Sequence, residues 1–415
     1  LEREEADAIV ELVARARRTG MPLAAAMEAA SVSVADTVCA GVANLTDVVR
    51  RGGSAGRSMA DTDAAALAHR IAKTIGVTRI AQVGELVPFG LHVTSVYRPS
   101  NWSSTIGSGK SETPEGAVIG GVMEELEKYS QERFRPEVVR TASYVSLRQD
   151  ISVRAVDPRS LSLPYDSAYT DDRVFGWTPV RDLISGKEVL VPEAALASSR
   201  IANDIFFSAR AGRKVFSSNG LAAGMTVSEA LLHALCECIE RHANKLSEQD
   251  ISNPGGASER RWPDYKFIDL SSCPDSTKQL TAKIRDAGYE TRVLDIVTDI
   301  GVPTFAVRVF RADRLHGLDE QFCVGSCTHP NPEVAINRAV LEAVQTRIGR
   351  SSGAREDMGL KPRSLGRHER PRPVSRGDAY WIRPHVPKIA YGQVQGQVGA
   401  SVKADIDFVV KKLAR

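Results

Sequence analysis

A short pattern occurs three times in this 415-residue chain and restricts its fold more than any other feature. The copies are GSGKSETPEGAVIGGVMEELEK at 107–128, SNGLAAGMTVSEALLHALCECIER at 218–241 and VGSCTHPNPEVAINRAVLEAVQTR at 324–347. Each begins with a glycine-containing turn and continues with a residue that can start a helix. We therefore expect three helices of similar build, and we name these segments the first, second and third units.

The residue expected to cap each helix is Thr113, Thr226 or Asn331. Thr113 and Asn331 are each followed by Pro and then Glu, a composition favoured in the first turn of a helix. Thr226 is followed three residues later by Glu229, which is the spacing of a capping box. The caps therefore give a common register in which the three units can be compared.

Counted from these caps, polar residues recur at two fixed positions. The eleventh residue is Glu124, Glu237 or Glu342, and the fourteenth is Glu127, Glu240 or Gln345. Residues three apart lie on one face of a helix, so each helix should present its polar pair in one direction. Such pairs are common on solvated helix faces, but identical offsets in three units favour a shared site.

Convergence of the first two helices would bring four carboxylates together. Like charges at short range raise one another's pKa, and a divalent cation relieves their repulsion. Oxygen ligands suit Mg²⁺, which usually shares its coordination shell with phosphates. Turns that lead into helix N-termini supply N–H groups for phosphate oxygens, and Lys110 and Arg241 are cations that such a site needs. The units thus predict a site for Mg²⁺ and a nucleotide.

Two motifs allow other interpretations. GSGKS at 107–111 is close to a Walker A loop, but Ser104 stands at the position of its first glycine, and no strand runs directly into it. Cys323, Cys327 and His329 have a spacing that could bind zinc. Because no second pair of ligands is evident, buried reduced thiols are favoured.

The composition disfavours several functional classes. The formal net charge of +3 at pH 7 gives no strong electrostatic preference for nucleic acid. No apolar run approaches the length of a membrane span, and no secretory signal opens the chain. Six cysteines in 415 residues do not indicate a disulfide framework. We therefore expect a cytoplasmic protein, although the sequence begins at Leu1 and a trimmed segment stays open.

The chain combines helical and strand-like segments, so the expected fold class is α+β (mixed α/β). Residues 2–85 are Ala-rich and have apolar residues at helical spacing. Strands are expected at 91–97, 188–191, 291–296 and 302–309. We divide the chain into a helical N-terminal region, a catalytic core, an Arg- and Pro-rich surface loop and a C-terminal segment of the core, at 1–85, 86–360, 361–388 and 389–415.

At these residues the sequence resembles the YcaO family. Its ATP site is described by Ser-x3-Glu-x2-Glu, then Glu-x2-Glu-Arg, and then Gln-x3-(Arg/Glu). The second element is intact as Glu237, Glu240 and Arg241, after a turn at 218–224 that resembles the family's Asn-Gly turn. The likeness extends from about Gly76 to Asp357.

The first and third elements depart from the family pattern. Glu124 and Glu127 match the first, but Gly120 replaces its Ser and Lys128 follows where Arg is usual. Lys110 matches the Lys of a Gly-Lys-Gly turn, with Ser111 in place of the second Gly. Gln345 matches the third element, but Gly349 occupies the Arg/Glu position, so Arg347, Arg350 or Arg355 would take that role.

The resemblance implies a YcaO-type fold in which three capped helices converge on a nucleotide cleft, with ATP and Mg²⁺ as cofactors. The implied nucleotide-binding residues are Lys110, Glu124, Glu127, Asn219, Glu229, Glu237, Glu240, Arg241, Gln345 and Arg347. Four of them are the implied metal ligands, Glu124, Glu127, Glu237 and Glu240. The implied catalytic residues are Lys110, Arg241 and Gln345.

In this family a nucleophile adds to a backbone amide, ATP phosphorylates the amide oxygen, and phosphate then leaves. Sulfide gives a thioamide, a side-chain nucleophile an azoline, and an amine an amidine. The segments at 76–99 and 288–309 look most like members that work with TfuA-like sulfur-delivery proteins. This sequence does not include the Pro-rich tail of azoline-forming members, and truncation of the chain is an alternative explanation for this. We therefore expect thioamide formation on a ribosomally synthesised precursor peptide, with azoline and amidine formation as alternatives.

The resemblance also implies a homodimer and, in the azoline branch, a leader-binding partner protein. The C-terminal DIDFVVKKLAR resembles the start of a longer family segment, so we expect the chain to be truncated there. A scaffold that binds a peptide or partner protein without turnover is the competing hypothesis. The changes at Gly120, Ser111 and Gly349 favour it, whereas the retained carboxylates argue against it.

Overall fold

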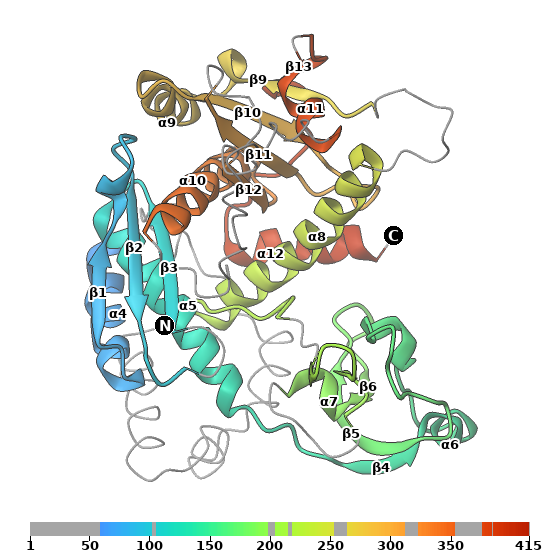
Figure 1. Ribbon diagram of the computed structural model, residues 1–415. Coiled ribbons are helices and arrows are strands. Elements are labelled where there is room, and N and C mark those ends of the chain that lie inside the picture. Colours follow the sequence, from blue (N-terminus) through green and yellow to red (C-terminus); the bar gives the residue numbers. More distant parts are fainter. Residues whose placement is uncertain are drawn as a thin grey trace, which may run out of the picture.

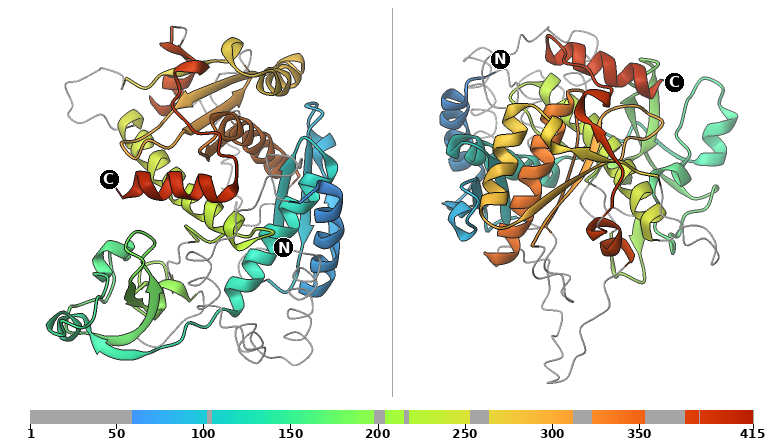
Figure 2. Two further views of the ribbon diagram at one scale, coloured as in Figure 1. Left: turned by 180° about the vertical axis from the view of Figure 1, so that it is seen from behind. Right: turned by 90° about the horizontal axis from the view of Figure 1, so that it is seen from above.

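The structure is a computed structural model. It describes residues 59–101, 105–197, 204–214, 218–252, 264–311, 323–352, 376–383 and 385–414. Within these residues the strands form four sheets. Figure 1 and Figure 2 show how the sheets and helices are arranged. None of the described helices is long and apolar enough to cross a membrane.

The first sheet has three antiparallel strands in the order β1-β2-β3, and helices cover one of its faces. Its strands are β1 (Arg79–Gln82), β2 (His92–Tyr97) and β3 (Ile106–Ser111), with the short helix η2 (Gly84–Leu86) between β1 and β2. The covering helices are α4 (Asp61–Ile75) and α5 (Pro114–Arg133). Val96 of β2 packs in one core with both helices, including Leu67 and Val122. Helix α4 ends at Gly76, whose φ of 87° is accessible to glycine without strain.

The second sheet has five strands in the order β12-β11-β10-β9-β13. They are β9 (Phe267–Asp269), β10 (Glu290–Asp295), β11 (Thr304–Phe310), β12 (Cys323–Thr328) and β13 (Lys388–Ala390), and only the β13–β9 pair is parallel. On one face lie α9 (Asp275–Asp286) and α10 (Pro332–Ser351). The short helices η4 (Leu270–Ser272) and η6 (Tyr391–Gln393) lie beside these strands in sequence.

Helix α10 joins the two sheets into one unit. Its Ala339 and Val340 share a core with Val307 of β11 and with Val93 of β2. Val93 and Val96 point to opposite faces of β2, because side chains alternate along a strand. The first sheet is therefore buried on both faces, and α10 lies between the sheets in Figure 1.

The other face of the second sheet is covered by α8 (Val227–Ser252) and α11 (Arg376–Ile382). Ala243 of α8 and Trp381 of α11 share a core with Leu294 of β10. Helix α12 (Val402–Leu413) packs along α8, where Ile406 and Val409 meet Ile239. The five-stranded sheet thus holds α8 and α10 on its two sides.

A smaller lobe is inserted between α5 and α8, and it lies apart from the two sheets in Figure 1. Its main sheet is antiparallel in the order β4-β5-β6. The core of the lobe contains Phe175 and Trp177 of β5 with Leu147 and Ile205. Its elements are β4 (Arg140–Ser143), α6 (Tyr144–Gln149), η3 (Pro158–Leu161), β5 (Val174–Arg181), β6 (Glu188–Pro192), α7 (Glu193–Leu196), β7 (Phe207–Ser208) and β8 (Arg213–Lys214).

The α+β class expected from the sequence is confirmed. The four expected strands are also confirmed, and they correspond to β2, β6, β10 and β11. The glycine-containing starts of the first and third units are strands, β3 and β12, rather than turns. Residues 1–58 and 353–375 lie outside the described residues. The described part of the predicted helical N-terminal region contains the helix α4 and also the strand β1. The described part of the predicted Arg- and Pro-rich loop contains the helix α11.

The strand β3 also removes the Walker A interpretation. A P-loop wraps its glycines around phosphate between a strand and a helix. Here GSGKS is itself a strand, paired residue for residue with β2 from Gly107↔Val96 to Ser111↔His92.

Candidate functional site

The three helices α5, α8 and α10 begin at the caps expected from the sequence. The side-chain oxygens of Thr113, Thr226 and Asn331 accept hydrogen bonds from the backbone N–H groups of Gly116, Glu229 and Glu333 at 3.2, 3.1 and 2.9 Å. The carboxylate of Glu229 accepts the N–H of Met225 at 3.0 Å and is buried. The structure therefore places Glu229 in the cap of α8.

Helix α5 brings Glu124 and Glu127 to the edge of β3. Glu124 Oε2 accepts the N–H of Ser108 at 3.0 Å, and its Oε1 lies 2.9 Å from the ammonium nitrogen of Lys128. Burial, together with the charges of Glu124 and Glu237, raises the pKa of Glu127 to about 8, against the ammonium of Lys128 and the N–H of Ala223. Glu127 therefore lies close to a carboxylate of its own helix and to one of α8.

Helix α8 presents the second pair. Glu237 Oε2 accepts the N–H of Gly220 at 2.9 Å, and Arg241 donates to Glu237 Oε1 at 3.3 Å. Gly220 has a φ of 81°, which explains the glycine after Asn219 in this turn. Asn219 itself is exposed. The loop before α8 thus folds back onto the helix beside Glu237.

Glu240, one turn further along α8, faces the third unit. Its Oε1 accepts the hydroxyl of Ser326 in β12 at 2.8 Å. Burial raises the pKa of Glu240, with a further contribution from the charge of Glu342, while Lys110 lowers it. Lys110 in turn donates to Glu342 Oε2 at 2.8 Å. Lys110 of the first unit therefore lies among carboxylates of the second and third units.

Helix α10 contributes an amide to the same region. Gln345 Nε2 donates to the carbonyl oxygen of Ser108 at 2.7 Å, across 237 residues of sequence. Arg347 follows two residues later on α10 and is half-buried. The structure thus brings Lys110, Gln345 and the two glutamate pairs to one region, with Arg241 on the same helix as Glu237.

Two residues at this site, Ser108 and Ser326, were not singled out from the sequence, and Glu342 was predicted as part of a polar pair but not as a nucleotide-binding residue. A signal for all three was present. Glu342 shares the eleven-residue offset of Glu124 and Glu237, and both serines stand five residues before their caps. Their contacts to other units, however, depend on how the units meet in space.

Among the described residues, no three His, Cys, Asp or Glu side chains are placed to hold a metal ion by themselves. Cys323 and Cys327 are buried, and His329 Nδ1 accepts the N–H of Asn331 at 3.0 Å. The mutual repulsion of Glu124, Glu127 and Glu237 fits a Mg²⁺ ion that completes its shell with phosphate oxygens. The donor set is therefore suited to a metal that arrives with a nucleotide.

Comparison with known proteins identifies the family. The family described as YcaO cyclodehydratase, ATP- and Mg²⁺-binding, matches residues 108–415. The chain belongs to the YcaO family. ATP and Mg²⁺ are the cofactors of YcaO proteins, as the resemblance implied.

An uncharacterized protein from the tfuA 3′ region of Rhizobium leguminosarum bv. trifolii is 30% identical over 303 residues, which cover 72% of this chain and 67% of the relative. Two solved structures share the YcaO fold. YcaO from Methanopyrus kandleri, bound with AMPPCP and Mg²⁺, has a TM-score of 0.62 at 18% identity and covers 89% of this chain and 86% of its own. A heterocyclase in complex with substrate and cofactor has a TM-score of 0.66 at 19% identity, covering 89% of this chain but 50% of its own.

Proposed function

We propose that this chain uses MgATP to phosphorylate the oxygen of a peptide backbone amide and thereby forms a thioamide. The observation that best supports a nucleotide site here is the position of Glu127, whose pKa is raised to about 8 by burial and by the charges of Glu124 and Glu237. Such crowding of carboxylates on two helices is costly unless a cation joins them. The site would hold Mg²⁺ through Glu124, Glu127, Glu237 and Glu240.

The cations at the site would bind the phosphates. Lys110 is held by Glu342 at 2.8 Å and is 24% exposed, so its ammonium can also reach a ligand. Arg241 is 55% exposed and has one carboxylate oxygen at 3.3 Å, which leaves guanidinium donors for phosphate oxygens. When bound, Mg²⁺ would neutralise charge on the phosphoryl group. Both cations stabilise the same negative charge as it moves toward ADP.

The proposed reaction balances without a redox step. The nucleophile adds to the amide carbon, and the resulting alkoxide oxygen attacks the γ-phosphorus of ATP with release of ADP. The C–O bond then breaks, and phosphate departs with the bonding electrons and the former amide oxygen. With hydrosulfide (HS⁻) as the nucleophile, sulfur replaces this oxygen, and the S–H proton passes to the departing phosphate.

The preference for sulfide rests on the relative encoded in the tfuA 3′ region. A TfuA-like sulfur-delivery protein and a precursor peptide are the partners that we propose. The homodimer implied by the resemblance stays a prediction.

Calorimetry with AMPPCP tests the nucleotide site. Wild-type protein should bind the analogue with Mg²⁺ and bind it much more weakly with EDTA. Glu237→Gln should weaken binding about tenfold to a hundredfold, because loss of one charge-assisted ligand costs about 1.5–3 kcal/mol. Glu290→Gln on β10, half-exposed and outside the site, serves as the control. Equal affinities with Mg²⁺ and EDTA would contradict the site.

Mass spectrometry of a co-expressed precursor peptide tests the reaction. Exchange of oxygen for sulfur adds about 16 Da, whereas azoline or amidine closure removes about 18 Da, as the atoms lost from the phosphorylated amide require. A peptide of unchanged mass, with ATP, a sulfur donor and the partner supplied, would favour the binding scaffold.

A further inference from the structure

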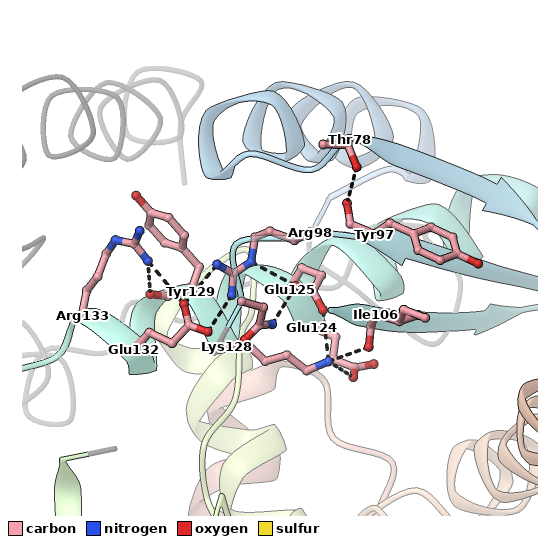
Figure 3. A network of polar contacts seen from close by, with 11 residues as sticks. Thr78, Tyr97, Arg98, Ile106, Glu124, Glu125, Lys128, Tyr129, Glu132 and Arg133 are labelled. Carbon is pink, nitrogen blue, oxygen red and sulfur yellow. Dashed lines mark hydrogen bonds and ion pairs between the residues drawn. The ribbon is translucent and has the colours of Figure 1, made fainter. Parts of the chain in front are cut away.

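A buried ionic network lies next to Glu124, on the side of α5 that faces β2 and β3 (Figure 3). At its centre is Arg98, which follows β2 and is fully buried. Its Nε donates to Glu125 at 3.1 Å, and its two terminal nitrogens donate to the two oxygens of Glu132 at 3.1 Å each. Glu125 is fully buried and also accepts from Asn101 at 3.2 Å. Glu125 is thereby fixed by two donors from the segment after β2.

Lys128 connects this network to the proposed nucleotide site. Its ammonium nitrogen lies 2.9 Å from Glu124 Oε1, 3.0 Å from Glu125 Oε1 and 2.9 Å from the carbonyl oxygen of Ile106. A lysine has three N–H donors, and each has one acceptor here. The side chain is 17% exposed, so it is held in one position rather than moving in solvent.

The three contacts of Lys128 fix the two parts of the first unit relative to each other. Ile106 is the first residue of β3, and Glu124 accepts the N–H of Ser108 two residues later. Between them, Gly107 lies so close to α5 that a Cβ would come within 2.8 Å of Glu125. Lys128 therefore holds both the carboxylate of Glu124 and the start of the strand that carries Lys110.

Packing alone does not explain this network. In the third unit, the residues equivalent to Glu125 and Lys128 are Ala343 and Thr346. Gly325 of β12 nevertheless lies as close to α10, since a Cβ there would come within 2.1 Å of Ala339 O. Buried ion pairs also gain little stability over apolar residues of similar volume. In the second unit, whose helix also presents two carboxylates, the equivalent residues are Cys238 and Arg241, and Arg241 pairs with Glu237. Among the described residues of the three units, the buried charged network is therefore particular to the first.

We infer that Lys128 is a positioning residue of the nucleotide site: it sets Glu124 and β3 for the metal and phosphates without contacting either. The Arg98–Glu125–Glu132 network in turn sets Lys128. This inference rests on the proposed function, because it assigns Glu124 to a metal that accompanies the nucleotide.

Calorimetry with AMPPCP and Mg²⁺ on Lys128→Met is the first test. Removal of a group that orients a metal ligand typically costs about tenfold to a hundredfold in affinity, and we expect at least tenfold here. Lys128→Arg, which keeps the charge, should restore most of the affinity. Lys278→Met serves as the control, since Lys278 is 45% exposed and has one ion-pair partner on its own helix α9. Wild-type affinity in Lys128→Met would overturn the inference. A smaller fraction of protein able to bind, with unchanged affinity in that fraction, would also overturn it, because it indicates a folding defect only.

Hydrogen exchange of the nucleotide-free protein separates this inference from the proposed function. Lys128→Met should increase amide exchange at 106–109 and leave 323–328 unchanged, because only β3 depends on Lys128. Unchanged exchange at 106–109 would overturn the inference. If wild-type protein failed to bind AMPPCP with Mg²⁺, the proposed function would fail, and exchange would still decide whether Lys128 positions β3.

Discussion

The first and third units share one design and use it differently. In both, a glycine strand lies directly on the helix that follows: a Cβ on Gly107 would meet Gly121 O at 3.0 Å, and one on Gly325 would meet Ala339 O at 2.1 Å. In the first unit the strand bonds to its own helix, through Ser108 N–H and Glu124. In the third, the equivalent serine, Ser326, reaches Glu240 of α8, and the strand bonds to its own helix through Thr346 and the carbonyl of Val324.

Helices α5 and α10 also differ in what their polar pairs contact. Helix α5 presents Glu124 and Glu127, whereas α10 presents Glu342 and Gln345, and both residues of α10 contact β3 of the first unit. The first unit thus carries the carboxylates, and the third fixes the strand beside them. The repeated backbone geometry sets where a polar pair lies, and the residue type at one position decides whether it binds a ligand or another unit.

The largest effect that this comparison predicts comes from the fourteenth position, where the first unit has Glu127 and the third has Gln345. Because the pKa of Glu127 is raised to about 8, its carboxyl is mostly protonated at neutral pH and must lose the proton to bind Mg²⁺. Affinity for AMPPCP with Mg²⁺ should therefore rise about tenfold per pH unit up to about pH 8. Calorimetry from pH 6 to 9, in buffers of different ionisation enthalpy, measures both the affinity and the proton released.

Glu127→Gln, which gives the first unit the residue of the third, should flatten this pH dependence. An unchanged slope in the variant would mean that another group titrates. The raised pKa of Glu127 should affect folding stability in the opposite direction to nucleotide affinity as the pH rises. The unfolded chain loses the proton near pH 4.5 and the folded protein near pH 8, so the unfolding free energy should fall as pH rises between them.

The chemistry of the caps shows what the sequence could and could not predict. Thr113, Thr226 and Asn331 act on neighbours within three residues, so their spacing alone set the register of the glutamates. The strands β3 and β12 could not be recognised, because their glycines lower strand propensity and are needed only for close contact with a helix.

The remaining contacts depend on the tertiary structure. Lys110–Glu342 joins residues 232 positions apart, and Gln345–Ser108 joins residues 237 apart. The Arg98–Glu125–Glu132 network is buried, although residues of these types are mostly exposed in proteins. No local pattern indicates such contacts, since the first two form only when α10 packs on β3, and the network forms only when α5 packs on the first sheet.

An intermediate effect should come from neighbouring residues of α10. Gln345 bonds to the carbonyl of Ser108 in the first unit, whereas Thr346 bonds to the carbonyl of Val324 in its own unit at 2.9 Å. Gln345→Ala should lower the unfolding free energy by about 1–2 kcal/mol, since it leaves a partly buried carbonyl without its partner. It should also weaken binding of AMPPCP with Mg²⁺ several-fold.

Thr346→Val is the matched control, which should cost about 0.5–1 kcal/mol in urea unfolding and leave the affinity unchanged. Equal losses of affinity in the two variants would break the distinction between contacts across units and contacts within a unit.

The smallest effect is expected at Gly120 of α5, and it should be opposite in sign to that of its neighbour Gly121. A Cβ on Gly120 would lie 3.4 Å from Gly109 Cα, an ordinary contact, whereas one on Gly121 would lie 2.8 Å from Val96 Cγ2 and 3.1 Å from Gly109 N. Gly120→Ser, the residue of the family pattern, should raise the unfolding free energy by about 0.5 kcal/mol, because Ser loses less backbone entropy than Gly in a helix. Gly121→Ala should lower it by about 1–3 kcal/mol, because Val96 is buried and has little room to move. Urea unfolding of both variants measures the signs, and a loss of stability in Gly120→Ser would show that the first unit has no space for the serine of the family pattern.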